Sequence, residues 1–188
     1  MQNVESLNGS NNIIIGNRVP YEFFITKGAG HSDIAVHAGS YHLALKDAGI
    51  ESFNIITYSS ILPKQATEIS NPSNLVHGSV METIMAVGHF DKGVTGTAGI
   101  IFGWLFDKET DERYGGLVCE YAGSISEEEM GTQLNASLQE LYTNGFSDQY
   151  NLKDIRLITN TFKPTKTFGT VLDALCFVSY LYPIIRNA

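Results

Sequence analysis

Hydrophobic and polar residues alternate along this chain in short runs that predict many strands and a pair of helical segments. Runs rich in β-branched and aromatic residues, bounded by Gly, Pro, Asn or charged residues, are typical of strands. Such runs occur at residues 20–26, 51–59, 80–90, 98–106, 115–123, 153–162 and 169–178. Because several of these strands follow one another without an intervening helix, the pattern predicts an α+β fold.

The first helical segment is predicted over residues 35–48, where Ala48 and Gly49 provide a stop. Spacings of three and four residues predict a buried stripe made of Ala35, Ala38, His42 and Leu45. Immediately before this helix, the glycine-containing segment KGAGHSD at residues 27–33 is predicted to be a loop.

The second helical segment is predicted over residues 124–145. Ser126, followed three residues later by Glu129, forms a capping box, and Gly145 supplies the stop. The start of the chain is polar and rich in Asn, and we assign residues 1–19 to a mobile tail. Residues 20–188 then form a single domain.

Composition narrows the class of protein. The chain has 188 residues, 43 % of them hydrophobic, and a net charge of −8. This acidic balance argues against a nucleic-acid partner, because nucleic acids select basic surfaces. No run approaches the ~18 apolar residues of a membrane span, and the first residues lack the basic start of a signal peptide. We therefore expect a cytoplasmic protein without a membrane partner.

The cysteines and histidines give no sign of a metal site. Cys119 and Cys176 lie in separate apolar runs, which favours small buried side chains over a disulfide or a metal ligand. His37 and His42 are five residues apart, so they do not share one face of a helix. We therefore predict no metal.

The segment NIITYSSILPKQ at residues 54–65 is a first candidate for chemistry. A β-branched strand enters the pair Ser59–Ser60, and Pro63 follows. Alternation along the strand places Asn54 on the same face as Ser60. The serines could form a plain turn. Alternatively they react, with Asn54 donating a hydrogen bond to the developing oxyanion.

Glu120 is a second candidate, because it is the only charged residue of the apolar run GGLVCEY. A carboxylate buried without a partner tends to take up a proton, which raises its pKa. An acid tuned in this way suits proton donation near neutral pH. The alternative is that Glu120 pairs with a Lys or Arg elsewhere in the chain.

Together these residues resemble the pyruvoyl-dependent arginine decarboxylases, in particular the chlamydial type. The segment IESFNIITYSSILPK at residues 50–64 is similar to that family's self-cleavage segment. It has an Asn six residues before the reactive serine, a Ser or Thr just before it, and an apolar pair and Pro after it. The segments GGLVCEY (115–121) and HGSVMETIMA (77–86) are also similar, and the match covers residues 20–180.

The resemblance implies self-processing. In that family the hydroxyl of the second serine, here Ser60, attacks the carbonyl of the preceding residue, here Ser59. The chain splits into a β chain, 1–59, and an α chain, 60–188, and residue 60 becomes a covalent pyruvoyl cofactor. Its ketone forms a Schiff base with the amino-acid substrate and acts as the electron sink when CO₂ leaves. Glu120 matches the family's proton donor.

The resemblance also implies a carboxy-lyase that converts L-arginine to agmatine, with His42, Asp47, Glu51 and Phe53 as substrate-binding residues. In the family an aspartate stands at the position of His42 and holds the guanidinium of the substrate. A histidine is neutral or positive and does not replace it. Either Asp33 or Asp47 takes that role here, or the substrate is another amino acid such as histidine.

The resemblance implies a four-layer α-β-β-α sandwich that assembles as a homotrimer or a dimer of trimers, with active sites between subunits. One alternative belongs to another class of protein. The chain could be an uncleaved, non-catalytic homologue that acts as a structural or regulatory subunit. Ser59, Ser60, Asn54 and Glu120 argue against this alternative, and His42 argues for it.

Overall fold

The computed structural model describes residues 13–70, 72 and 75–187. Its helical elements are a π-helix, η1 (Val36–Tyr41), and the α-helices α1 (His42–Asp47) and α2 (Glu127–Gly145). The strands are β1 (Ile13–Ile15), β2 (Val19–Pro20), β3 (Glu22–Ser32), β4 (Asn54–Thr57), β5 (Ile61–Pro63), β6 (Thr67–Glu68), β7 (Val80–Asp91), β8 (Gly96–Asp107), β9 (Arg113–Gly123), β10 (Tyr150–Phe162), β11 (Phe168–Phe177), β12 (Tyr180–Leu181) and β13 (Ile184–Asn187). The predicted α+β class is confirmed.

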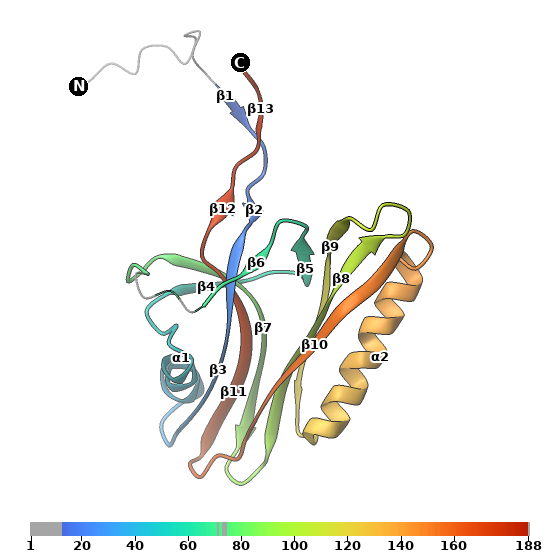
Figure 1. Cartoon of the computed structure of the whole chain (residues 1–188). Helices are drawn as coiled ribbons and strands as arrows, with labels where there is room; N and C mark the ends of the chain where they lie inside the picture. The colour runs from blue at the N-terminus through green and yellow to red at the C-terminus, as the bar shows by residue number, and fades with distance from the viewer. Residues whose placement is uncertain (1–12, 71, 73–74, 188) are drawn as a thin grey trace, which may run out of the picture.

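Two sheets make up the body of the molecule (Figure 1). One has the strand order β4-β7-β11-β3-β6 and the other the order β10-β8-β9-β5. Side chains alternate between the two faces of a strand, so each sheet can bury one face against the other sheet. The cluster between the sheets contains Phe23, Ile84, Val171 and Leu175 from the first sheet and Ala98, Ile100, Phe102 and Val118 from the second.

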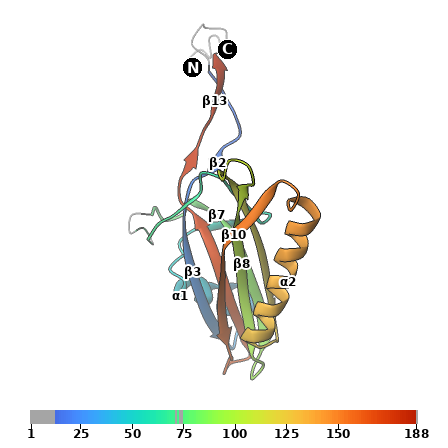
Figure 2. The same ribbon diagram turned by 45° about the vertical axis from the view of Figure 1, so that its right-hand side comes forward.

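The helices cover the opposite faces of the two sheets. Helix α1 packs on the five-stranded sheet, and α2 runs along the four-stranded sheet (Figure 2). The α1 cluster contains Ala44, Leu45, Leu172, Ala174 and Cys176. The α2 cluster contains Met130, Leu134, Leu138, Ile101 and Leu105. Ser126 caps α2 as predicted, since its hydroxyl accepts a hydrogen bond from the backbone amide of Glu129 at 3.2 Å.

The prediction of a loop at residues 27–33 was wrong, because β3 continues through this segment to Ser32. The glycines serve close packing. A Cβ atom on Gly28 would lie 2.1 Å from the carbonyl oxygen of Ala44, and one on Gly30 would lie 2.5 Å from that of Ser40. These glycines let the helical segment approach the backbone of the sheet, which explains their presence inside a strand.

The predicted stripe of the first helical segment was also wrong in part. Leu45 is buried, but Ala38 and His42 are exposed. The buried positions are Ser40, Ala44, Leu45 and Ala48. The backbone amide of Ser40 bonds to the carbonyl of Ala35, five residues earlier, as in a π-helix. This wider turn shifts the face that meets the sheet, so a period of 3.6 residues does not apply here.

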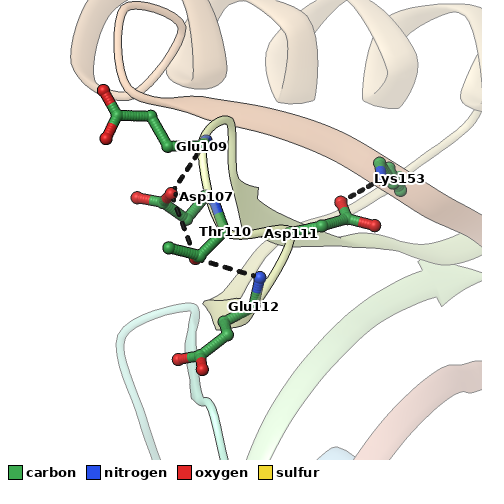
Figure 3. Close-up of polar contacts among 6 residues, drawn as sticks. All are labelled: Asp107, Glu109, Thr110, Asp111, Glu112 and Lys153. Atoms are coloured by element: carbon green, nitrogen blue, oxygen red, sulfur yellow. Dashed lines mark hydrogen bonds and ion pairs between the residues drawn. The ribbon is translucent and has the colours of Figure 1, made fainter.

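A side chain closes the turn between β8 and β9. The Asp107 carboxylate accepts hydrogen bonds at 2.9 Å from the backbone amides of Glu109 and Thr110 (Figure 3). These bonds hold the pKa of Asp107 below its usual value. Asp111, in the left-handed region with φ of 57°, forms an ion pair with Lys153 of β10.

The two ends of the described chain pair with each other. β1 pairs antiparallel with β13, and β2 with β12, in a ribbon that extends away from the two sheets in Figures 1 and 2. Residues 1–12 of the predicted tail lie outside the described residues. In the remainder of that predicted tail, Ile13–Ile15 and Val19–Pro20 are paired strands of this ribbon.

Cys119 and Cys176 are free thiols; Cys176 is buried as predicted, whereas Cys119 is only half-buried. Over residues 13–70, 72 and 75–187, no helix has the length and apolar character needed to cross a membrane. In the same part of the chain, no group of three or more His, Cys, Asp or Glu side chains is arranged to hold a metal ion.

Candidate active site

The connection between β4 and β5 carries the chain from one sheet to the other. The amide of Tyr58 donates to the carbonyl of Thr83 on β7 at 2.7 Å, which ties it to the five-stranded sheet. The carbonyl of Ser60 accepts from the amide of Val118 on β9 at 3.0 Å, which ties it to the four-stranded sheet. The peptide bond between Ser59 and Ser60 therefore lies at the crossover.

Ser60 and Glu120, predicted separately from the sequence, are in contact. The Ser60 hydroxyl donates to the Glu120 carboxylate and lies 2.7 Å from each of its oxygens. Among the residues that the structure describes, Glu120 has no Lys or Arg within ion-pair distance. Its polar partner is therefore the serine hydroxyl, and a hydroxyl bonded to a carboxylate is one that can lose its proton.

Burial controls the protonation of Glu120. The side chain is half-buried, and desolvation raises the pKa of its carboxyl, while the Ser60 hydrogen bond offsets part of that rise. The neighbouring Cys119 thiol also has a raised pKa, because of burial and the charge of Glu120. An acid with this environment keeps its proton to a higher pH than an exposed glutamate does.

The carbonyl oxygen of Ser59 has its own donor, which the sequence reasoning missed. The amide of Ile61 lies 2.7 Å from this oxygen in a tight turn centred on Ser60. If the Ser60 hydroxyl attacks the Ser59 carbonyl, negative charge develops on this oxygen, and an amide donor stabilises it. No side-chain pattern could have shown this donor, because it belongs to the backbone.

A cavity of about 390 Å³ opens beside the Ser60–Glu120 pair. Strand β9 and helix α2 form its walls. The sequence reasoning did not identify the α2 contribution, although Gln133 and Ser137 are four residues apart on that helix. The lining residues are Ser60, Val118, Cys119, Glu120, Tyr121, Gln133, Leu134, Ser137 and Leu141. We call this space the serine cavity.

Most of the predicted substrate-binding residues line a different cavity. A second cavity, of about 370 Å³, lies beside the first helical segment and β4. Its lining residues are His37, Tyr41, His42, Leu45, Glu51, Phe53, Asn54 and Ile55. We call this space the histidine cavity. It contains His42, Glu51 and Phe53 but shares no residue with the serine cavity.

Asn54 does not lie where strand alternation placed it. Its side-chain amide donates to the carbonyl of Gly78 at 2.8 Å, and it lines the histidine cavity. The alternation fails to extend to Ser60 because β4 ends at Thr57 and the chain then leaves the sheet. Within one chain, the backbone amide of Ile61 is the donor that reaches the Ser59 carbonyl.

The acids considered as replacements at the His42 position are engaged elsewhere. The Asp47 carboxylate accepts the amide of Ala29 at 2.9 Å and does not line the histidine cavity. Asp33 accepts the amide of Thr167 at 3.0 Å, which lowers the pKa of Asp33. Glu51 is the carboxylate that lines the histidine cavity.

The arrangement around Ser60 suits acyl transfer and acid–base chemistry. A hydroxyl bonded to a carboxylate, an adjacent carbonyl with an amide donor, and a cavity beside both make this a candidate enzyme site. The sheet crossover brings these groups together from the β4–β5 connection and from β9, which are far apart in sequence.

The chain belongs to the pyruvoyl-dependent arginine decarboxylase family, whose model matches residues 22–181. The family consists of carboxy-lyases that use a covalent pyruvoyl cofactor. The resemblance predicted from the serine segment is thereby confirmed, and so is the prediction of an enzyme.

Several relatives with this activity in their names are similar to this chain. Pyruvoyl-dependent arginine decarboxylase AaxB of Chlamydia trachomatis serovar L2 is 32 % identical over 188 residues, which cover 88 % of this chain and 94 % of that protein. The protein of the same name from Chlamydia muridarum has the same identity and coverage. A pyruvoyl-dependent arginine decarboxylase of Methanococcoides burtonii is 40 % identical over 72 residues, 36 % of this chain and 38 % of that protein.

Proposed function

We propose that this protein is a self-processing decarboxylase that converts L-arginine to agmatine and CO₂. One observation carries the proposal: the Ser60 hydroxyl is bonded to Glu120 while the adjacent Ser59 carbonyl accepts a backbone amide. The nucleophile, a proton acceptor and an oxyanion donor thus surround one peptide bond.

Cleavage proceeds by an acyl shift from nitrogen to oxygen. Ser60 Oγ attacks the Ser59 carbonyl carbon, and Glu120 takes the hydroxyl proton. The C–N bond breaks as the Ser60 nitrogen takes up a proton, so an ester replaces the amide. Loss of the Ser60 Cα proton then expels the Ser59 carboxylate from Cβ. The remaining dehydroalanine takes up water and releases ammonia, which leaves a pyruvoyl group at residue 60.

The surroundings of residue 60 fit such a group, because it would lie in the serine cavity next to Glu120. A pyruvoyl group supplies a ketone that condenses with the substrate amine and accepts the electron pair released with CO₂. We assign to Glu120 the donation of a proton to the substrate carbon that has lost CO₂. Its raised pKa supports this role.

We propose that the side chain of the substrate is held by the histidine cavity of a neighbouring subunit. The separation of the two cavities within one chain supports a homotrimer, or a dimer of trimers, with active sites between subunits. Glu51 then supplies the carboxylate that pairs with the guanidinium, and Phe53 contributes an apolar wall of the same cavity. Asn54 would reach Ser60 only across this interface. The cytoplasmic location stays a prediction.

His42 favours a second candidate, a decarboxylase of the same type for another amino acid. His37 and His42 both line the histidine cavity, and neither attracts a guanidinium. Release of CO₂ from a panel of amino acids distinguishes the candidates. If arginine is the substrate and His42 limits it, His42→Asp raises arginine turnover, because a carboxylate pairs with the guanidinium. Unchanged turnover would indicate that Glu51 suffices.

We also propose that residues 20–188 form one domain with a four-layer α-β-β-α sandwich. The three separate hydrophobic clusters support it, since one fills the space between the sheets and each of the others joins a sheet to its helix. Cleavage would leave a β chain of residues 1–59 and an α chain of residues 60–188, held together by the contacts of β4 and β5 with β7 and β9.

Denaturing mass spectrometry of the purified protein tests self-processing. We expect two fragments divided between Ser59 and Ser60, the larger with a blocked, borohydride-reducible N-terminus. Ser60→Ala removes the nucleophile and should leave the chain intact. A single 20.6 kDa species after long incubation of the unaltered chain would overturn the proposal and favour a non-catalytic subunit.

A further inference from the structure

Glu82 is a buried carboxylate that the proposed reaction does not use. It lies on β7 with 2 % of its surface exposed. Its side chain forms an ion pair with Arg18 and accepts a hydrogen bond from the Tyr58 hydroxyl. A charge in the interior is costly unless it is paired and hydrogen-bonded, and these two partners satisfy that requirement.

The three side chains join segments that are distant in sequence. Arg18 lies just before β2, Tyr58 just after β4, and Glu82 within β7. Arg18 also stacks over the ring of Tyr180, 5.1 Å from its centroid. The group therefore connects the base of the terminal ribbon to the point where the chain leaves the five-stranded sheet. We call Arg18, Tyr58 and Glu82 the anchor.

Tyr58 is fixed at several points, immediately upstream of the serine pair. Its amide bonds to the carbonyl of Thr83, its hydroxyl to Glu82, and its ring packs against Phe177 at a centroid distance of 5.6 Å. Downstream of the scissile bond, β5 pairs with β9, and the Ser60 carbonyl bonds to the Val118 amide. The Ser59–Ser60 bond is thus held from both sheets, with little chain between the two attachments.

We propose that Glu82 and Tyr58 are positioning residues for self-cleavage. This inference rests on the proposed function. The acyl shift needs the Ser60 oxygen close to the Ser59 carbonyl carbon and aligned with it, and a restrained segment reaches that geometry more often than a free one. Glu82 acts through Tyr58. It holds the tyrosine side chain in place, and the fixed tyrosine sets the orientation of the adjacent Ser59 backbone. Arg18 balances the charge of Glu82.

The anchor should affect cleavage but not decarboxylation. Neither Tyr58 nor Glu82 lines the serine cavity or the histidine cavity. Once the Ser59–Ser60 bond is broken, these two side chains have no further role in the reaction. A role limited to general stability would instead lower the melting temperature without a selective effect on the cleavage rate.

The test compares cleavage rates of freshly refolded full-length chains, followed by denaturing mass spectrometry. Tyr58→Phe keeps the ring and removes the hydroxyl, and we expect cleavage to slow by roughly ten- to a hundred-fold, the effect of losing a hydrogen bond to a charged group. Glu82→Gln keeps an acceptor for the tyrosine but removes its charge, so cleavage should slow measurably but less than in Tyr58→Phe, by about two- to ten-fold. A cleavage rate equal to that of the unaltered chain would remove Glu82 from the positioning role. Both variants, after complete cleavage, should show an unchanged kcat and KM for decarboxylation.

Thr97→Val is the matched control. Thr97 is fully buried, and its hydroxyl donates to the Ile125 carbonyl at 2.6 Å, away from the crossover. This variant should lose stability and cleave at the normal rate. If Tyr58→Phe cleaves as fast as the unaltered chain, or no more slowly than Thr97→Val, the anchor has no positioning role. If the unaltered chain does not cleave at all, the proposed function fails and this inference fails with it.

Discussion

At the scale of single residues, the environment of Glu120 controls when its carboxyl holds a proton. Burial raises the pKa of this group, so the protonated form persists to a higher pH than for an exposed glutamate. If the protonated form is the proton donor, decarboxylation declines as the pH rises through this raised pKa. A pH profile of kcat with a falling alkaline limb would reflect this titration.

Glu120→Gln separates the two roles of this residue. The amide cannot donate an acidic proton, so we expect decarboxylation to fall by about 10²–10⁴-fold. Its carbonyl oxygen still accepts the Ser60 hydroxyl and keeps it oriented, but the amide cannot take up the hydroxyl proton, which then passes to water. The two fragments should therefore still form, but more slowly. CO₂ release and mass spectrometry on the same sample measure both effects. Full turnover by this variant would remove Glu120 from the reaction.

Asp173 makes stability depend on pH. It is fully buried on β11, and among the described residues neither of its carboxyl oxygens has a hydrogen-bond partner. Burial raises the pKa of Asp173 to about 7, and the charge of Lys27, its neighbour on β3, only partly offsets this. The folded protein therefore holds the proton more tightly than the unfolded chain. Stability is highest below the unfolded pKa and is lost as the pH rises through about 7.

Asp173→Asn removes this titration. Relative to the unaltered chain, the variant should gain unfolding free energy between pH 4 and pH 8, by up to about 4 kcal/mol, the equivalent of a shift of about three pKa units. Urea denaturation across this pH range measures the difference. Asp148→Asn, at an exposed carboxylate, is the control for losing a surface charge. A constant difference between Asp173→Asn and the unaltered chain at all pH values would contradict the prediction.

At the scale of elements, the close packing of α1 on β3 depends on glycine. Gly28→Ala would place a Cβ atom 2.1 Å from the Ala44 carbonyl oxygen and 2.8 Å from the Ala48 amide nitrogen. Both are backbone atoms of the helical segment, so the helix must move. We expect a loss of about 3 kcal/mol of unfolding free energy, at the upper end of overpacking effects.

Chemical denaturation of Gly28→Ala and of a control checks this prediction. Gly145→Ala, at the end of α2, would place its Cβ in open space and should change stability by less than about 1 kcal/mol. Equal stability of the two variants would mean that α1 can shift on β3 without cost.

Most elements were predictable because their signals are local. The long strands β7, β8, β9, β10 and β11 follow apolar, β-branched runs, and α2 has its capping box and its stop. The first helical segment was harder, because a π-helical turn changes the period on which the stripe was predicted. The short strands β1, β2, β5, β6, β12 and β13 were missed, because they are too brief to show an alternation.

At the scale of the whole molecule, the histidine and serine cavities do not meet within one chain. If neighbouring subunits complete each site, two inactive variants should restore activity when mixed. Ser60→Ala lacks the pyruvoyl precursor, and Glu51→Ala lacks the carboxylate of the histidine cavity. A mixed oligomer contains interfaces that combine the intact serine cavity of one chain with the intact histidine cavity of another.

Co-refolding the two variants in equal amounts should give about a quarter of the unaltered activity, the share of interfaces with two intact halves under random mixing. Each variant refolded alone is the control and should be inactive. Absence of activity in the mixture, with oligomers present by light scattering, would place the whole site within one chain.

Local pattern was sufficient for the α+β class, the long strands and the capped helix, and it singled out Ser59, Ser60 and Glu120 as candidates. These features depend on neighbours in sequence, where hydrophobic periodicity, turn residues and a charge in an apolar run are informative. Tertiary structure alone decided which of these residues meet. Ser60 contacts Glu120, sixty residues away, because the chain crosses between sheets and β5 pairs with β9. Because of the same crossover, Asn54 lines the histidine cavity, and the Ile61 amide donates to the Ser59 carbonyl. Contacts between distant strands follow from sheet pairing and not from the period of any one strand.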